Sequence, residues 1–252
     1  MSGILGLMWG LAGWLVARAS EGWRGWLLPL LLVCFEVTQH LPPWIFPWNP
    51  VAAVVTPWPV LLRPLPVLGA PGLSLVLLLL GSGLDLLLVR ARRREGVAIA
   101  AGAVVLWAVT AWLAPGFQPV GEPFTAAAVQ PNVPLEERWD PDNEDAIEAR
   151  VWRYSAAAAE AGASLVTWSE SSIPRYVQQD GAYRVDIERF ARTRGVWLLL
   201  GSIGFGAGEG EYYNSVFVAS PGGLLPYRYD KIHLVPFGEY LPLVGHLPFL
   251  KP

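Results

Sequence analysis

Two apolar runs separated by a short basic cluster set the strongest limit on how this chain folds. Residues 73–89 and 97–113 are both 17 residues long, and roughly 17–25 apolar residues suffice to cross the hydrocarbon core of a bilayer. Between them lie four arginines in residues 90–94. A short arginine-rich loop is typical of the cytoplasmic side of a membrane. The pattern predicts two membrane-spanning helices, with everything after Pro115 on the far side.

Two shorter apolar runs, residues 4–16 and 26–37, precede this pair and have tryptophans at their flanks. Arg18 and Arg24 flank the loop between them, which places that loop on the same side as the basic cluster. We therefore expect about four membrane spans in residues 1–120; the alternative is a pair of buried helices in a soluble protein. Residues 40–66 combine prolines with tryptophans, which excludes regular helix and predicts a position at the outer interface.

Charge and cysteine content exclude several classes of function. Residues 121–252 carry eleven basic and seventeen acidic side chains, and residues 1–120 carry seven arginines and four acids. Neither half has the basic excess that a phosphate backbone requires, which argues against nucleic-acid binding. Cys34 is the single cysteine, so no internal disulfide forms. His233 and His246 lack partners at metal-ligand spacing, so we expect neither a metal nor a cofactor.

The second half, residues 121–252, has the pattern of a layered α/β domain. Short apolar runs predict buried strands, and helical periodicity ending at glycine predicts helices between them. Two further strands flank the turn Ser220-Pro-Gly-Gly223 and predict a hairpin. The expected strands are residues 125–129, 165–168, 196–200, 212–219 and 224–229, and the expected helices are 143–161 and 186–194.

Charged side chains follow two of these strands, where functional residues are commonly placed. Glu170 follows the strand 165–168; in a partly buried pocket its pKa would rise, which suits a general base. Lys231 could stabilise an oxyanion or hold Glu170 ionised. The alternatives are a solvated loop for Glu170 and an ion pair with Asp230 or another surface acid for Lys231. Glu239 follows a glycine turn and either hydrogen-bonds the lysine, orients a substrate or anchors its loop.

Other candidate motifs lack the spacing that their chemistry needs. The glycine-rich residues 201–210 have no phosphate-loop ending, so a flexible loop between strands is expected there. Ser169 and Ser171 flank Glu170 without the glycines of a nucleophile elbow. Cys34 is expected at a helix interface as a small apolar residue.

Taken together, these motifs resemble the apolipoprotein N-acyltransferases, which are membrane enzymes with a nitrilase-like domain. The resemblance covers most of the chain. It rests on Ala128-Val-Gln-Pro-Asn-Val-Pro134 with Trp139-Asp-Pro141, Val166-Thr-Trp-Ser-Glu170, Tyr212-Tyr-Asn-Ser215, Tyr229-Asp-Lys231, His233-Leu-Val-Pro-Phe-Gly-Glu-Tyr240, Phe46-Pro-Trp-Asn49 and Gly69-Ala-Pro-Gly-Leu-Ser74.

The resemblance implies a helical membrane region followed by an αββα nitrilase-like sandwich. It implies that Glu170 is the general base, Lys231 the oxyanion lysine and Glu239 a further essential glutamate. The family's nucleophilic cysteine lies beyond the lysine, so we expect the 252-residue chain to be incomplete at both ends and inactive by itself. Ser169 stands where the family usually has proline.

The implied activity is N-acylation of bacterial lipoproteins through an acyl thioester. A membrane phospholipid donates the acyl chain, and the N-terminal diacylglyceryl-cysteine of a lipoprotein accepts it. The implied location is the bacterial inner membrane, with the second domain on the periplasmic side, and the expected state is a monomer. Two alternatives stay open: a catalytically inactive membrane-bound scaffold or relic, and a nitrilase or amidase that acts on a small amide.

Overall fold

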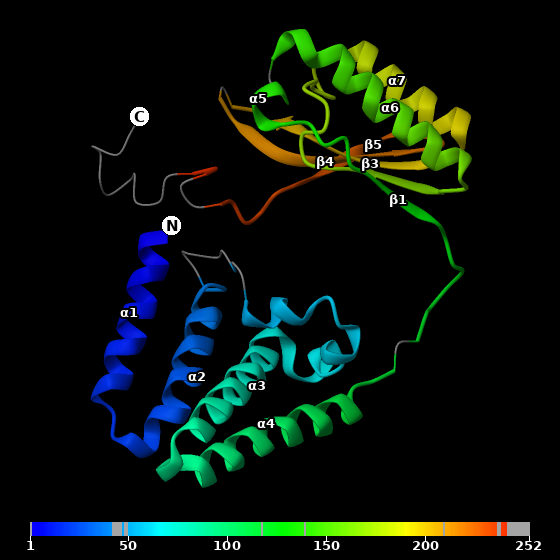
Figure 1. The fold of residues 1–252 in the computed structure, drawn as a ribbon. Helices are drawn as coiled ribbons and strands as arrows, with labels where there is room; N and C mark the ends of the chain where they lie inside the picture. Colours follow the sequence, from blue (N-terminus) through cyan, green and yellow to red (C-terminus); the bar gives the residue numbers. More distant parts are fainter. Residues whose placement is uncertain are drawn as a thin grey trace, which may run out of the picture. The chain divides into compact units, whose positions relative to one another are not determined.

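The computed structural model places the chain in two compact units. The first comprises Met1–Gln118 together with the segment that begins at His233, and the second comprises Pro119–Ile232. Figure 1 shows the first as helices and the second as a sheet with helices beside it. The structure describes residues 2–41, 47, 50–116, 118–138, 140–208, 210–235 and 238–240.

Apolar helices make up most of the first unit. They are α1 (Ser2–Arg18), α2 (Glu21–Thr38), α3 (Leu65–Leu88) and α4 (Arg93–Leu113), with the short 3-10 helices η1 (Val51–Val55), η2 (Pro59–Leu62) and η3 (Arg90–Arg92). Among the described residues, Leu65–Leu88 and Arg90–Leu113 are long and apolar enough to cross a membrane. Core helices of soluble proteins can meet the same test, so the four expected spans stay a prediction.

The third apolar helix begins earlier than the sequence predicted. It starts at Leu65 rather than at residue 73, and it contains a break at Gly69, whose φ is 65°. That left-handed conformation costs glycine little, and Pro71 then falls near the start of the straight segment, where its missing N–H is harmless. The preceding proline-rich segment forms only 3-10 turns where it is described, as its prolines require; residues 42–46, 48 and 49 lie outside the described residues.

Glycines let α3 and α4 approach each other closely. A Cβ at Gly83 would lie 2.6 Å from the backbone nitrogen of Ala100, and one at Gly96 would lie 2.7 Å from the carbonyl oxygen of Gly83. On the other side of α3, the hydroxyl of Ser82 donates a 2.7 Å hydrogen bond to the carbonyl of Gly25 in α2. Small residues and hydroxyl-to-carbonyl bonds are the contacts by which helices pack in an apolar solvent.

The second unit is built on a five-stranded mixed sheet in the order β1-β2-β3-β4-β5. Parallel pairing joins the first three strands, and antiparallel pairing joins the last three. The strands are β1 (Ala126–Val129), β2 (Leu165–Trp168), β3 (Trp197–Phe205), β4 (Tyr212–Ser220) and β5 (Gly223–Asp230), and the helices are α5 (Leu135–Arg138), α6 (Glu144–Glu160) and α7 (Gly181–Arg194), with the 3-10 helix η4 (Pro141–Asn143).

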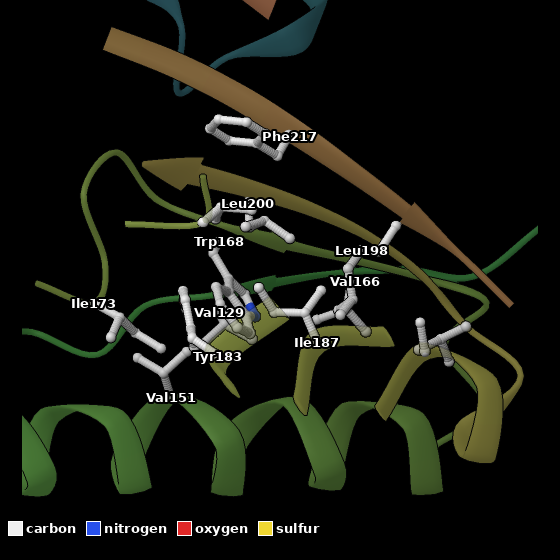
Figure 2. Packing of buried hydrophobic residues seen from close by; sticks show 14 of the residues in the cluster. Val129, Val151, Val166, Trp168, Ile173, Tyr183, Ile187, Leu198, Leu200 and Phe217 are labelled. Atoms are coloured by element: carbon white, nitrogen blue, oxygen red, sulfur yellow. The ribbon is translucent and has the colours of Figure 1, made fainter. Parts of the chain in front are cut away.

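Helices α6 and α7 cover one face of this sheet (Figure 1). Figure 2 shows the core between them, where Val166, Leu198 and Leu200 of the sheet meet Val151 of α6 and Ile187 of α7. All five are fully buried. Burial alternates along β4, and this period of two distinguishes the helix-covered face from the opposite face. The alternating α/β pattern is confirmed, while the second sheet of an αββα sandwich stays a prediction.

Two element boundaries in this unit differ from the sequence prediction by more than one residue. Helix α7 begins at Gly181 rather than at residue 186, because the carboxylate of Asp180 caps it by accepting a hydrogen bond from the backbone of Tyr183. Strand β3 continues to Phe205 instead of ending at residue 200. The expected flexible loop over residues 201–210 is therefore wrong for its first half, since Gly201 to Phe205 pair with β4.

Candidate functional site

Glu170 and Lys231 face each other at one edge of the mixed sheet. The Nζ atom of Lys231 lies 3.9 Å from Oε2 of Glu170, and their side chains are 29% and 60% exposed. An ion pair as exposed as this contributes only about 0–1 kcal/mol of stability. The pairing by itself does not distinguish a surface ion pair from a catalytic pair, so the catalytic role of both residues stays a prediction.

Asn214 joins the two charged residues. Its side-chain amide donates a hydrogen bond of 2.5 Å to Oε1 of Glu170. Its backbone carbonyl accepts a 2.8 Å hydrogen bond from the backbone nitrogen of Lys231. One residue of β4 thus fixes a carboxylate oxygen through its side chain and the start of the lysine segment through its main chain.

The backbone that carries Glu170 crosses close over β3. A Cβ at Gly201 would lie 2.8 Å from the carbonyl oxygen of Ser169 and 2.9 Å from Cα of Glu170. A glycine inside a strand often marks such a close backbone approach. The next residue, Ser171, has a φ of 48°, a left-handed conformation that is uncommon for a residue with a side chain. Glu170 and Ser171 thus form a tight turn directly after β2.

Arg175 anchors the loop that follows Glu170. Its guanidinium pairs with Glu148 of α6 at 2.8 Å and with Asp180 at 2.5 Å. Its carbonyl accepts a hydrogen bond from the hydroxyl of the buried Ser202 in β3. The backbone N–H of Tyr183, followed by the Arg175 guanidinium, holds the pKa of Asp180 below its usual range. The loop is therefore fixed to both helices and to the sheet.

Asp230 does not form the ion pair with Lys231 that the sequence left open as an alternative. Its Oδ1 accepts hydrogen bonds from Nε of Arg228 at 2.7 Å and from the hydroxyl of Ser215 at 2.5 Å. The Arg228 hydrogen bond, with the one from Ser215, holds the pKa of Asp230 below its usual range. Lys231 faces Glu170 instead.

The structure leaves Glu170 exposed, as in the solvated-loop alternative of the sequence analysis. Its side chain is 60% exposed, so the described residues of this unit do not form the partly buried pocket that would raise its pKa. Glu170 lies in a turn, and the next residue, Ser171, has a left-handed φ of 48°. The sequence correctly predicted that Glu170 follows a strand. The end of a strand alone, however, does not determine whether the next side chain is buried or exposed.

The remaining candidates are placed in the first unit. Glu239 accepts a 2.7 Å hydrogen bond from the backbone of Val235 within its own turn, which agrees with the loop-anchor alternative. Cys34 lies on α2 and is exposed rather than buried at a helix interface, because its position on α2 faces away from the neighbouring helices. The catalytic role of Glu239 stays a prediction.

Sequence reasoning named neither Asn214 nor Gly201 as a site residue. Asn214 was noticed only as part of the motif Tyr212-Tyr-Asn-Ser215, and no spacing rule connects it with a glutamate 44 positions earlier. Gly201 was assigned to a flexible loop. Both roles depend on the register of β3 against β4, which the local pattern does not contain.

Two family models match separate segments of the chain. Residues 125–250 match the carbon-nitrogen hydrolase family model. Residues 1–83 match the model for the apolipoprotein N-acyltransferase N-terminal domain. The two matches fall on the part that contains the sheet and on the part that contains the first apolar helices.

Curated relatives match along nearly the whole chain. An apolipoprotein N-acyltransferase of Geobacter metallireducens is 33% identical over 96% of this chain and 49% of its own length. One of Methylococcus capsulatus is 33% identical over 98% of this chain and 49% of its own length. The chain thus spans about half the length of these relatives. Among solved structures, an amidase from Nesterenkonia sp. is 24% identical over 46% of this chain and 43% of its own, with a TM-score of 0.30.

Proposed function

Because the chain belongs to the carbon-nitrogen hydrolase family and its first 83 residues match the N-terminal domain of apolipoprotein N-acyltransferases, we propose that the full-length protein acylates lipoproteins. The acyl donor in this proposal is a membrane phospholipid, and the acceptor is the N-terminal amine of a diacylglyceryl-cysteine. The observation that carries the proposal is the pair formed by Glu170 and Lys231, 3.9 Å apart and oriented by Asn214.

Glu170 acts as the general base in the proposed reaction. It takes the proton from a cysteine thiol, the nucleophile that the resemblance implies, and the thiolate attacks the ester carbonyl of the phospholipid. Glu170 returns the proton to the departing alkoxide, and a lysophospholipid leaves. In the second half, Glu170 removes a proton from the lipoprotein amine as that amine attacks the thioester. The thiol is restored and an amide remains.

Lys231 stabilises the oxyanion that forms in both tetrahedral intermediates. An ammonium group beside the reacting carbonyl lowers the energy of the developing negative charge, and removal of one such donor typically costs about 10²–10³-fold in rate. The side chain of Lys231 is only 29% exposed, so it is held near the base rather than free in solvent. In this proposal Glu239 is a further essential glutamate, as the resemblance to the family implies.

A membrane location follows from the substrates, since both carry acyl chains that leave a bilayer only at high cost in free energy. We propose the bacterial inner membrane, with the arginine loop at residues 90–94 in the cytoplasm by the positive-inside rule. The sheet-containing unit then lies on the periplasmic side. We propose that one copy of the protein is sufficient for the reaction.

The test uses the full-length protein in detergent with a phospholipid whose acyl chain carries a label. We expect a protein-bound label that hydroxylamine releases, which is the property of a thioester, and its transfer as an amide to a diacylglyceryl-cysteinyl peptide. Glu170→Gln and Lys231→Met should each lower the rate by at least about 100-fold. Arg189→Gln on the exposed side of α7 is the control and should leave the rate unchanged.

Two results would refute the proposal. Release of ammonia from small soluble amides without labelling by phospholipid would favour an amidase. A stable, folded full-length protein that takes no label and hydrolyses no amide would favour the scaffold alternative.

A further inference from the structure

Six arginines gather at one end of the first unit, where its two shortest helix connections lie. The turn between α1 and α2 and the turn between α3 and α4 are at the same end of these helices (Figure 1). Contacts join the two turns: the hydroxyl of Ser82 donates to the carbonyl of Gly25 at 2.7 Å, and a Cβ at Gly25 would lie 3.5 Å from Oε1 of Glu95. The arginines are Arg18, Arg24, Arg90, Arg92, Arg93 and Arg94.

Carboxylates offset only part of this positive charge. Glu21, Asp85 and Glu95 lie at the same end of the unit. Arg92 binds both oxygens of Glu95, at 2.6 and 2.9 Å. Within the described ranges this is the one ion pair that the six arginines form with a carboxylate. The other five guanidinium groups therefore give this end of the unit an excess of positive charge.

Backbone carbonyls hold two of these guanidinium groups in place. Arg24 donates from Nε to the carbonyl of Ala19 at 3.0 Å and from Nη2 to that of Ala17 at 3.2 Å. Arg93 donates from Nε to the carbonyl of Leu87 at 3.1 Å. Both arginines are exposed, and a guanidinium has five N–H donors. Most of their donors thus stay available to an anion, and the side chains are ordered before that anion binds.

Exposed tryptophans beside the arginines indicate which kind of anion this end fits. The guanidinium of Arg18 lies 3.9 Å from the ring centroid of Trp14, and both Trp14 and Trp23 are exposed. Tryptophan is enriched where a membrane meets water, at the level of the lipid headgroups. A water-soluble phosphate compound would leave these rings without a partner. A lipid, in contrast, brings a phosphate to the guanidinium groups and apolar chains to the indole rings.

We propose that this end of the helical unit binds anionic phospholipids of the cytoplasmic leaflet, and that Arg24 and Arg93 supply the ordered phosphate-binding groups. The inference rests on the proposed membrane location, in which the arginine loop is cytoplasmic. Phosphate oxygens accept paired N–H bonds from a guanidinium, and basic clusters at cytoplasmic helix ends attract anionic headgroups. A zwitterionic lipid binds less tightly, because its own ammonium group is repelled by the arginines. A lipid held in this leaflet is a bound partner and not the proposed acyl donor, since acyl transfer is proposed on the periplasmic side.

The test measures lipid binding to the full-length protein in detergent by native mass spectrometry. The probes are ether-linked phosphatidylglycerol and ether-linked phosphatidylethanolamine with identical alkyl chains, so only the headgroup differs. Ether-linked chains cannot be transferred, so the measurement stays valid if the proposed acyl transfer fails. We expect phosphatidylglycerol to bind at least about tenfold more tightly, because each arginine near an anionic headgroup is worth about a fivefold change in affinity. Added salt should weaken this preference.

Substitutions then locate the binding groups. Arg24→Gln and Arg93→Gln should each lower the affinity for phosphatidylglycerol about fivefold. Arg24→Lys should give a smaller loss, because lysine keeps the charge but lacks the planar fork. Arg63→Gln is the matched control and should leave the affinity unchanged, since this exposed arginine precedes α3 at the opposite end of the same unit. If a glutamine variant loses its helical dichroism, the pair Arg90→Gln and Arg94→Gln replaces it, and a lower affinity is expected again.

Three results would overturn the inference. Equal binding of the two lipids would show that the headgroup charge is not recognised. Equal losses from Arg63→Gln and from the variants at the arginine-rich end would indicate diffuse attraction between charges instead of a site. Displacement of phosphatidylglycerol by an equal concentration of glycerophosphoglycerol, which has the same headgroup without chains, would assign this end of the unit to a soluble phosphate compound.

Discussion

Replacement of Gly201 by alanine tests whether the close crossing over β3 positions the proposed base. The added Cβ would lie 2.8 Å from the carbonyl oxygen of Ser169 and 2.9 Å from Cα of Glu170. Two carbon atoms reach their optimal separation only at about 3.5–4.0 Å. The backbone at Cα of Glu170 must therefore retreat by roughly 0.6 Å, the difference between about 3.5 Å and 2.9 Å. Both neighbouring atoms belong to the main chain, so no side-chain rotation relieves the overlap.

The displacement should act on rate more than on substrate binding. A shift of about 1 Å in a catalytic group can cost about 100-fold, so we expect the acylation rate of Gly201→Ala to fall about 10- to 100-fold with little change in KM. Overpacking of this kind also destabilises a fold by about 1–3 kcal/mol. The assay is labelling of the full-length protein by phospholipid, with the rate divided by the folded fraction measured in a denaturant titration.

Gly181→Ala is the matched control. Gly181 is the first residue of α7 in the same unit, and a Cβ there would meet no other atom within 4 Å. It should keep the native rate and lose no stability. A Gly201→Ala protein that labels at the native rate per folded molecule would refute the argument that the crossing at β3 sets the position of Glu170.

Further predictions concern both units. Asn214→Ala should lower the acylation rate about tenfold or more, because the base loses the donor at one oxygen; single-turnover labelling measures it. Gly96→Val should destabilise the first unit by at least about 1–3 kcal/mol, since its side chain would meet a backbone oxygen; thermal unfolding in detergent checks this, with Gly102→Val, which meets nothing, as the control. Asp180→Ala should destabilise the fold above pH 3.8, the ordinary pKa of this group, and this loss should shrink as the pH falls through its lowered folded-state pKa; unfolding titrations at several pH values measure it. The 252-residue polypeptide by itself should form no acyl thioester, because its one cysteine lies exposed on α2; hydroxylamine-labile label on it would contradict the mechanism.

Local pattern was sufficient where neighbouring residues decide the structure. The strand Leu165–Trp168 was predicted to the residue, because a short apolar run bounded by polar residues has few other solutions. The hairpin turn at Ser220 to Gly223 was likewise readable from its glycines. The helix after Asp180 was predicted too short, since its first residue is a glycine, a poor helix former, and the side chain of Asp180 supplies the cap that starts it.

Local pattern failed where the decisive contact comes from a distant strand. The ion pair of Lys231 could not be chosen from the sequence, because Asp230 is its neighbour in the chain and Glu170 is not. The register of β4 against β5 decides it, since that register brings Ser215 opposite Asp230 and leaves the lysine beside Asn214.

The glycine-rich end of β3 contains two glycines whose spacing places them on opposite faces of the sheet. Gly201 lies under the backbone of Glu170, and Gly204 lies under the guanidinium of Arg228. The two are three positions apart, and an odd separation in a strand places them on opposite faces. A separation of two or four would put both gaps on one face and leave either the base or the arginine without room. The segment whose composition predicted a flexible loop is therefore a strand. Its two glycines leave room for the backbone of Glu170 on one face and for the guanidinium of Arg228 on the other.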